Sequence, residues 1–284
     1  MEIKKVCVAG GGLMGRQIAL NTAIYDYQVR LFELNAGVRM EVEKWAEEYL
    51  TGRIEKGRMS PEQVDGIKSR FKITETLEEA ASGADLVIEA IVEREDVKTE
   101  FFKQLNTLVR KDTIIATNSS CMPSSMFVDC IDNPERLCNL HYFNPALVMK
   151  LTEVVRGEHT GEATIQAMME FSKNTGKSPI LLNREIYGFI TNRILGAIYR
   201  EAHFLVEEGY CSYQDLDTAC ENGLSHSMGP YRLMDLTGID LEYDIMRTEY
   251  NSTGEKPAGF DIVEKMYSQG RYGRKTGKGF YDYS

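Results

Sequence analysis

The chain has 284 residues, of which 43% are hydrophobic and 27% charged, a composition typical of one or two globular domains. Its formal net charge of −10 argues against nucleic acid or an anionic membrane surface as a partner. No signal-peptide pattern or long apolar run occurs, and six cysteines without CxxC or Cys/His ligand spacing predict reduced thiols, no metal site and a cytoplasmic protein.

The first 185 residues alternate short β-branched runs with longer helical patterns. Strands are expected at residues 5–9, 28–34, 71–74, 85–91, 112–118, 136–142, 150–155 and 178–182. Such alternation predicts an α/β fold of the Rossmann type, with a mostly parallel sheet covered by helices on both faces. Residues 36–70 are too long for a single crossover helix and predict an inserted helical hairpin, with Ser60 and Pro61 starting its second helix.

A glycine-rich segment, "AGGGLMG", follows the first expected strand and opens a helix. Its G-x-G-x-x-G spacing is typical of a dinucleotide site, in which glycines permit a tight turn, close approach of a pyrophosphate and helix packing. The residues predicted to hold the cofactor here are Gly10, Gly12, Leu13, Met14 and Gly15. Glu33 ends the second strand, eighteen residues beyond Gly15, where a carboxylate binds ribose hydroxyls and repels a 2′-phosphate. The expected cofactor is therefore NAD.

Polar residues at the ends of later strands predict a catalytic group. His141 closes one strand, and Glu153 lies in the next. Asn118 closes the strand at 112–118 and Ser120 follows it, and ligands bind beyond the carboxyl ends of such strands. An imidazole oriented by a carboxylate can remove a hydroxyl proton while a hydride leaves for the cofactor. The other histidines, His159, His203 and His226, are expected to be structural.

The pattern changes after residue 185. Residues 188–210 have apolar side chains at helical spacing and end on Gly209, and no strand is expected beyond them. We therefore predict an NAD-binding domain over 1–185 and an all-helical domain over 186–284. Its segment "YRLMDLTGIDLEY" contains more apolar residues than a small core needs, which predicts a homodimer interface.

The segment "HYFNPALVMKLTEVV" resembles the signature of the L-3-hydroxyacyl-CoA dehydrogenase family. "AGGGLMG", "EAIVEREDVK", "TNSSC", "GFITNR" and "GRKTGKGFYDY" extend the resemblance over essentially the whole chain, which is most similar to short members acting on 3-hydroxybutyryl-CoA. The resemblance implies NAD-dependent oxidation of a short-chain (S)-3-hydroxyacyl-CoA, with an acyl-CoA thioester as the binding partner and a homodimeric assembly.

By motif, the resemblance also implies roles for single residues. His141 corresponds to the catalytic base, Glu153 to its acidic partner, and Ser120 and Asn192 to groups that contact the substrate. The positions implied to line the cofactor are Ala90, Glu93, Lys98, Asn118 and Asn144. Lys56, with Arg58, matches the part of the hairpin implied to meet coenzyme A.

Two alternatives remain open. The chain departs from the family at Tyr187, at residues 222–230 and at Cys121, the first two of which lie in regions expected near the substrate cleft. A related dehydrogenase for a free 3-hydroxy acid, of the carnitine dehydrogenase type, would share the fold and cofactor but lack a coenzyme A site. A non-enzymatic protein of the crystallin type would share only the fold.

Overall fold

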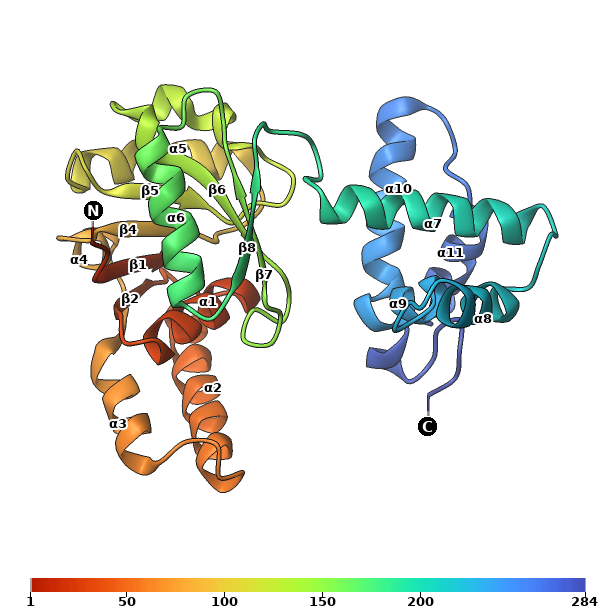
Figure 1. Ribbon diagram of the computed structural model, residues 1–284, viewed down its shortest axis with the longest axis horizontal. Coiled ribbons are helices and arrows are strands. Elements are labelled where there is room, and N and C mark those ends of the chain that lie inside the picture. The colour runs from red at the N-terminus through yellow and green to blue at the C-terminus, as the bar shows by residue number, and fades with distance from the viewer. Residues whose placement is uncertain (1, 284) are drawn as a thin grey trace. The chain divides into compact units, whose positions relative to one another are not determined.

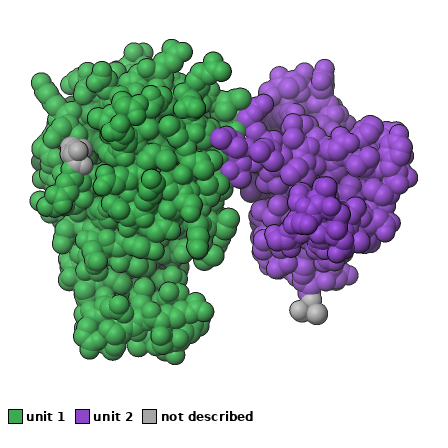
Figure 2. Space-filling model, in the orientation of Figure 1, with its two compact units in different colours: residues 1–189 green, residues 190–284 purple. Residues whose placement is uncertain are grey.

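An eight-stranded sheet forms the centre of the first of two units, Met1–Phe189 (Figures 1 and 2). The structure is a computed structural model and describes residues 2–283. The strands are β1 (Lys5–Ala9), β2 (Gln28–Phe32), β3 (Phe71–Thr74), β4 (Leu86–Glu89), β5 (Ile114–Thr117), β6 (Leu137–Tyr142), β7 (Leu151–Val155) and β8 (Ser178–Leu182). Their order in the sheet is β3-β2-β1-β4-β5-β6-β7-β8. The predicted Rossmann-type fold is confirmed.

All neighbouring strands run parallel except β6 and β7, which pair antiparallel. Strand order reverses between β1 and β4, and dinucleotides bind at such a reversal beyond the carboxyl ends of the strands. The antiparallel pair also places residues of β6 directly opposite residues of β7. Both features determine which side chains can meet at this edge of the sheet.

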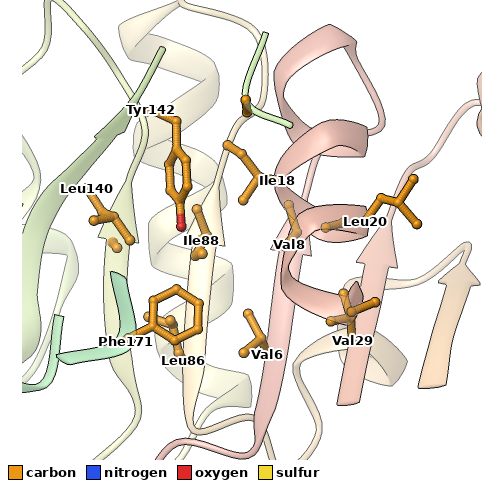
Figure 3. Packing of buried hydrophobic residues seen from close by; sticks show 14 of the residues in the cluster. Val6, Val8, Ile18, Leu20, Val29, Leu86, Ile88, Leu140, Tyr142 and Phe171 are labelled. Carbon is orange, nitrogen blue, oxygen red and sulfur yellow. The ribbon is translucent and has the colours of Figure 1, made fainter. Parts of the chain in front are cut away.

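The two faces of the sheet bury two separate apolar clusters, because successive side chains of a strand point to opposite faces. Val6 and Val8 of β1 pack with helices α1 (Leu13–Ile24) and α6 (Glu162–Asn174) on one face (Figure 3). Cys7 packs with α4 (Leu77–Ala81), α5 (Glu95–Leu108) and the 3₁₀ segment η1 (Ser124–Cys130) on the other. The sheet is therefore covered on both faces, as the continuous apolar strands predict.

Helices α2 (Ala36–Glu55) and α3 (Pro61–Arg70) form the expected hairpin, which projects from the sheet (Figure 1). Ser60 caps α3: its hydroxyl accepts the backbone N–H of Gln63, while the Gln63 side chain accepts the N–H of Ser60. The connecting loop turns at Gly57, which has a left-handed φ of 62°. Local capping thus ends one helix and starts the next, as the sequence indicates.

The second unit, Ile190–Ser284, is helical. It contains α7 (Thr191–Glu207), α8 (Tyr213–Gly223), α9 (Pro230–Thr237), α10 (Ile239–Thr253), α11 (Phe260–Ser268) and the short η3 (Arg274–Thr276). Tyr231, Met234 and Phe280 belong to a core of its own. None of the helices among residues 2–283 has the length and apolar character that a membrane span requires.

Candidate active site

The glycine loop between β1 and α1 has the conformation that a bound pyrophosphate needs. Gly10 has a φ of 106°, and a side chain there would meet the carbonyl of Ala90 at 2.4 Å. A side chain at Gly15 would meet the carbonyl of Gly10 at 1.9 Å, so only glycine lets α1 approach the turn. At Gly12 a side chain would meet nothing within 4 Å. Gly12 thus borders open space at the helix N-terminus, where no side chain of residues 2–283 caps α1.

The carboxylate of Glu33 lies beside this loop. Its Oε2 accepts the N–H of Gly11 at 2.8 Å, and its Oε1 accepts the N–H of Asn35 at the same distance. These two bonds hold a negative charge where an adenosine ribose lies in dinucleotide-binding folds. The residues present therefore fit NAD: an uncapped helix end and an open glycine for the pyrophosphate, and a fixed carboxylate for the ribose.

His141 and Glu153 are direct partners across the antiparallel pair β6–β7. The Nδ1–H of His141 donates to Oε2 of Glu153 over 2.8 Å, since an ionised carboxylate can only accept. In the neutral imidazole the proton is therefore on Nδ1, and Nε2 of His141 is unprotonated. Glu153 is fully buried, and His141 is 6% exposed.

Aromatic rings surround this imidazole. The ring centroids of Phe143 and Phe189 lie 4.6 and 5.5 Å from that of His141. Phe189 is buried and has a left-handed φ of 50°, unusual for a residue with a bulky side chain. Apolar neighbours exclude water and strengthen the hydrogen bond between His141 and Glu153.

The ends of β5 and β6 are joined by Asn118. Its backbone N–H donates to Glu89 O at 2.8 Å, and its side-chain Oδ1 accepts the N–H of Tyr142 at 2.9 Å. Ser120 follows, with its hydroxyl oxygen 3.6 Å from the Cys121 sulfur and no hydrogen bond to His141 in the described part of the chain. Asn118 thus has a structural bond that the sequence did not indicate, and Ser120 is half-buried with its hydroxyl at the same edge.

Glu93 and Lys98 belong to a partly buried ionic network at the ends of β4 and β5. The Lys98 ammonium lies 3.0 Å from Glu93 Oε2 and 2.5 Å from Glu89 Oε1. The Ser119 hydroxyl donates to Glu93, and the Thr117 hydroxyl donates to Glu89 Oε2 at 2.6 Å. Glu93 and Lys98 are among the predicted cofactor residues, whereas Glu89 is not, although a carboxylate that ends an apolar strand indicates that a partner must exist.

The loop between β6 and β7 carries Asn144, whose side-chain oxygen accepts from Gln17 Nε2 at 3.3 Å. Lys177 holds the far side of the loop by donating to the carbonyls of Ala146 and, at 3.0 Å, Met149. Burial lowers the pKa of Lys177 to about 8. The sequence does not predict these roles of Gln17 and Lys177, because their partners are backbone and amide groups far away in the chain.

Three further predicted residues are exposed side chains of the hairpin and of the second unit. Lys56 and Arg58 are exposed in the α2–α3 loop, and no ion pair is formed by either within residues 2–283. Asn192 belongs to the second unit and is exposed in the first turn of α7. The remaining cofactor residues Leu13, Met14 and Ala90 border the glycine loop, with Leu13 53% exposed.

Comparison with known proteins matches residues 5–186 to the family "3-hydroxyacyl-CoA dehydrogenase, NAD binding domain" and residues 188–283 to its C-terminal domain. A "Probable 3-hydroxybutyryl-CoA dehydrogenase" of Bacillus subtilis is 36% identical over 284 residues, covering 100% of this chain and 98% of that protein.

Two solved structures show the same architecture. The 3-hydroxybutyryl-CoA dehydrogenase of Escherichia coli K12 aligns with a TM-score of 0.90 and 32% identity, over 100% of this chain and 60% of that one. A diketoreductase described as acting on dicarbonyl compounds aligns with a TM-score of 0.91 and 27% identity, over 100% of both chains.

Proposed function

The chain belongs to the 3-hydroxyacyl-CoA dehydrogenase family, and from this premise we propose that it oxidises the 3-hydroxyl of a short-chain (S)-3-hydroxyacyl-CoA. It is an NAD-dependent dehydrogenase, and the reverse reaction is the reduction of acetoacetyl-CoA. The observation that supports the chemistry best is the buried His141–Glu153 pair at the sheet edge that carries the glycine loop.

NAD, when bound, supplies the hydride acceptor. His141 acts as general base, because the bond from its Nδ1–H to Glu153 leaves Nε2 free to take the hydroxyl proton. Glu153 holds the tautomer and stabilises the imidazolium that forms. In the proposal the Ser120 hydroxyl contacts the substrate oxygen, and Asn192 contacts the substrate from the helical unit.

The coenzyme A handle is the part of this proposal that a simple measurement tests. Acetoacetyl-CoA should be reduced at least ~10³-fold more efficiently than free acetoacetate, because binding energy from a remote handle orients the reacting group. NADH absorbance gives kcat/KM for both substrates. A chain that reduces neither would be a non-enzymatic relative and would overturn the proposal.

A second candidate keeps the fold and the base but removes coenzyme A from the substrate. The resemblance to a diketoreductase, whose described substrates are dicarbonyl compounds, favours it. Dehydrocarnitine or a free 3-keto acid would then be the better substrate in the same assay. The cofactor and the His141–Glu153 chemistry would be unchanged by that result.

We further propose that the protein is a cytoplasmic homodimer. In the second unit Leu236 and Leu241 are 50% and 53% exposed, as an interface would require, whereas Met234 and Ile239 of the same segment belong to the unit's own core. Sedimentation at micromolar concentration tests the dimer, and a monomer would contradict it. All six cysteines are free thiols, and a reducing compartment would keep them in that state.

A further inference from the structure

A fully buried carboxylate, Glu89, organises the ionic network at the ends of β4 and β5. It accepts three hydrogen bonds: Lys98 Nζ at 2.5 Å and the Ile91 N–H at 2.8 Å on Oε1, and the Thr117 hydroxyl at 2.6 Å on Oε2. Glu89 is 0% and Lys98 1% exposed. Burying a charged group costs free energy unless the group has a partner, and each of these two side chains has one.

The network carries one uncompensated negative charge. Glu89 and Lys98 neutralise each other, and Lys98 also lies 3.0 Å from a second carboxylate, Glu93. The Glu93 side chain is 41% exposed, and its other oxygen accepts the Ser119 hydroxyl. Because Lys98 cannot neutralise both carboxylates, the surplus charge is located at the exposed end of the network, on the side of Glu93.

Strand order places this charge on the nicotinamide half of the cofactor site. The first three strands, with Glu33 at the end of β2, form the adenosine half, and β4 and β5 begin the other half across the reversal point. Residue 90 borders the glycine turn, since the Ala90 carbonyl fills the space a side chain at Gly10 would need. Glu89 shapes the same segment through its bond to the N–H of Ile91.

We propose that the Glu89–Lys98–Glu93 network shifts the relative affinity of the site toward the oxidised cofactor, with Glu89 as a positioning residue that acts through Lys98. The inference rests on the proposed NAD-dependent function. The nicotinamide ring is positively charged when oxidised and neutral when reduced, so a nearby surplus negative charge stabilises only the oxidised form. A Lys98 paired with Glu93 alone would remove that shift.

The test compares the dissociation constants of NAD⁺ and NADH, measured without substrate by fluorescence titration and competition. Glu93→Gln and Glu89→Gln each remove the surplus charge and should raise the ratio Kd(NAD⁺)/Kd(NADH) about five- to tenfold. The double variant Glu89→Gln/Lys98→Met keeps one negative charge and should return the ratio to within about twofold of the parent. A merely structural role would weaken both cofactors alike and leave the ratio unchanged.

Glu162→Gln is the matched control. It removes one exposed carboxylate, paired with Arg156, at the start of α6 beyond the opposite edge of the sheet, where salt screens its charge. Circular dichroism checks folding, and if Glu89→Gln does not fold, the half-exposed Glu93→Gln variant decides the question. An unchanged ratio in Glu93→Gln overturns this inference, whereas failure of the parent chain to bind either dinucleotide overturns the proposed function itself.

Discussion

The proposed chemistry and the proposed cofactor effect depend on two buried pairs of ionisable side chains. Glu153 is paired with His141, and Glu89 with Lys98, and three of these four side chains are 1% exposed or less. An isolated buried carboxylate loses its hydration without compensation, so each pair behaves as a unit. Replacing one member therefore changes the environment of the other, and amide substitutions of similar size separate the chemistry from the packing most cleanly.

Replacing His141 by glutamine should lower kcat by ~10² or more, because general-base catalysis contributes on that scale. NADH affinity should stay nearly constant, since His141 bonds to Glu153 and not to the glycine loop. Steady-state kinetics with acetoacetyl-CoA and an NADH binding titration measure the two quantities.

Glu153→Gln should lower kcat nearly as much as His141→Gln does. The double variant should lose little more activity than His141→Gln alone, because the two residues form one functional unit. Full additivity of the two losses would mean that Glu153 acts independently of the imidazole. A His141→Gln enzyme that retained a third of its activity would refute the general-base role.

Glu33 should make the protein prefer NADH over NADPH by ~10² or more in kcat/KM, since its charge faces the place of a 2′-phosphate. Glu33→Gln keeps an acceptor for the Gly11 N–H while removing the charge, and should reduce the preference about tenfold. Glu75→Gln removes a neighbouring exposed carboxylate paired with Arg39 and serves as the control. Similar rates with both cofactors in the parent enzyme would contradict the assignment.

At the scale of an element, the α2–α3 hairpin is the inserted feature whose use the fold does not dictate. Its loop exposes Lys56 and Arg58, whereas Lys68 on the same hairpin lies 2.6 Å from Glu47. Cations without acidic partners are available to an anionic ligand at less cost than cations already paired. The hairpin is therefore the expected contact for the phosphates of a coenzyme A handle.

Lys56→Ala/Arg58→Ala should raise KM for acetoacetyl-CoA and weaken its salt dependence, because two charges near the phosphates are lost. Turnover of a small free keto acid should not change. Lys68→Ala removes one paired charge from the same hairpin and should leave KM for the thioester nearly unaltered. Equal effects of the two changes would indicate that the hairpin charges act only on solubility or general electrostatics.

At the scale of the whole molecule, each unit has its own core, and the second contains a buried histidine that no sequence pattern distinguished. His203 is fully buried, its Nδ1 lies 3.3 Å from the Tyr231 hydroxyl, and its Nε2 forms no hydrogen bond within the described residues. Burial lowers the pKa of His203 to about 4. The stability of the helical unit is therefore expected to depend on pH through His203.

The unfolded chain binds a proton at this histidine near its ordinary pKa, about 6.5, whereas the folded unit resists protonation down to about 4. The contribution of His203 to the free energy of unfolding is therefore fully present above pH 6.5. It should fall by about 1.4 kcal/mol per pH unit as the pH decreases toward 4. Urea unfolding between pH 7 and pH 4.5 measures the slope.

His203→Leu should remove that part of the slope, because no proton can then be taken up in the unfolded state. His226→Gln, at an exposed position in the same unit, serves as the control. An unchanged slope in His203→Leu would show that other groups cause the acid sensitivity.

Several features of the protein could be predicted from the sequence because they depend on neighbours in the chain. Glycine spacing, the Ser60 cap and the alternation of strand and helix act over one turn or one crossover, and they were sufficient for the fold, the hairpin and the cofactor loop. The position of Glu33 beside that loop could also be predicted, because the number of residues between the glycine motif and the acidic residue is similar in all dinucleotide-binding βαβ units.

Only the tertiary structure decided which distant side chains meet. His141 and Glu153 were expected to be close, but their direct opposition depends on the antiparallel direction and register of β7, since a shift of one residue would turn Glu153 to the other face. Glu89 and Lys98 meet where β4 ends and α5 begins, and Gln17 reaches Asn144 across 127 positions of sequence. Such pairings follow from strand register and helix packing, which are set by the summed burial of many side chains and not by the spacing of any single motif.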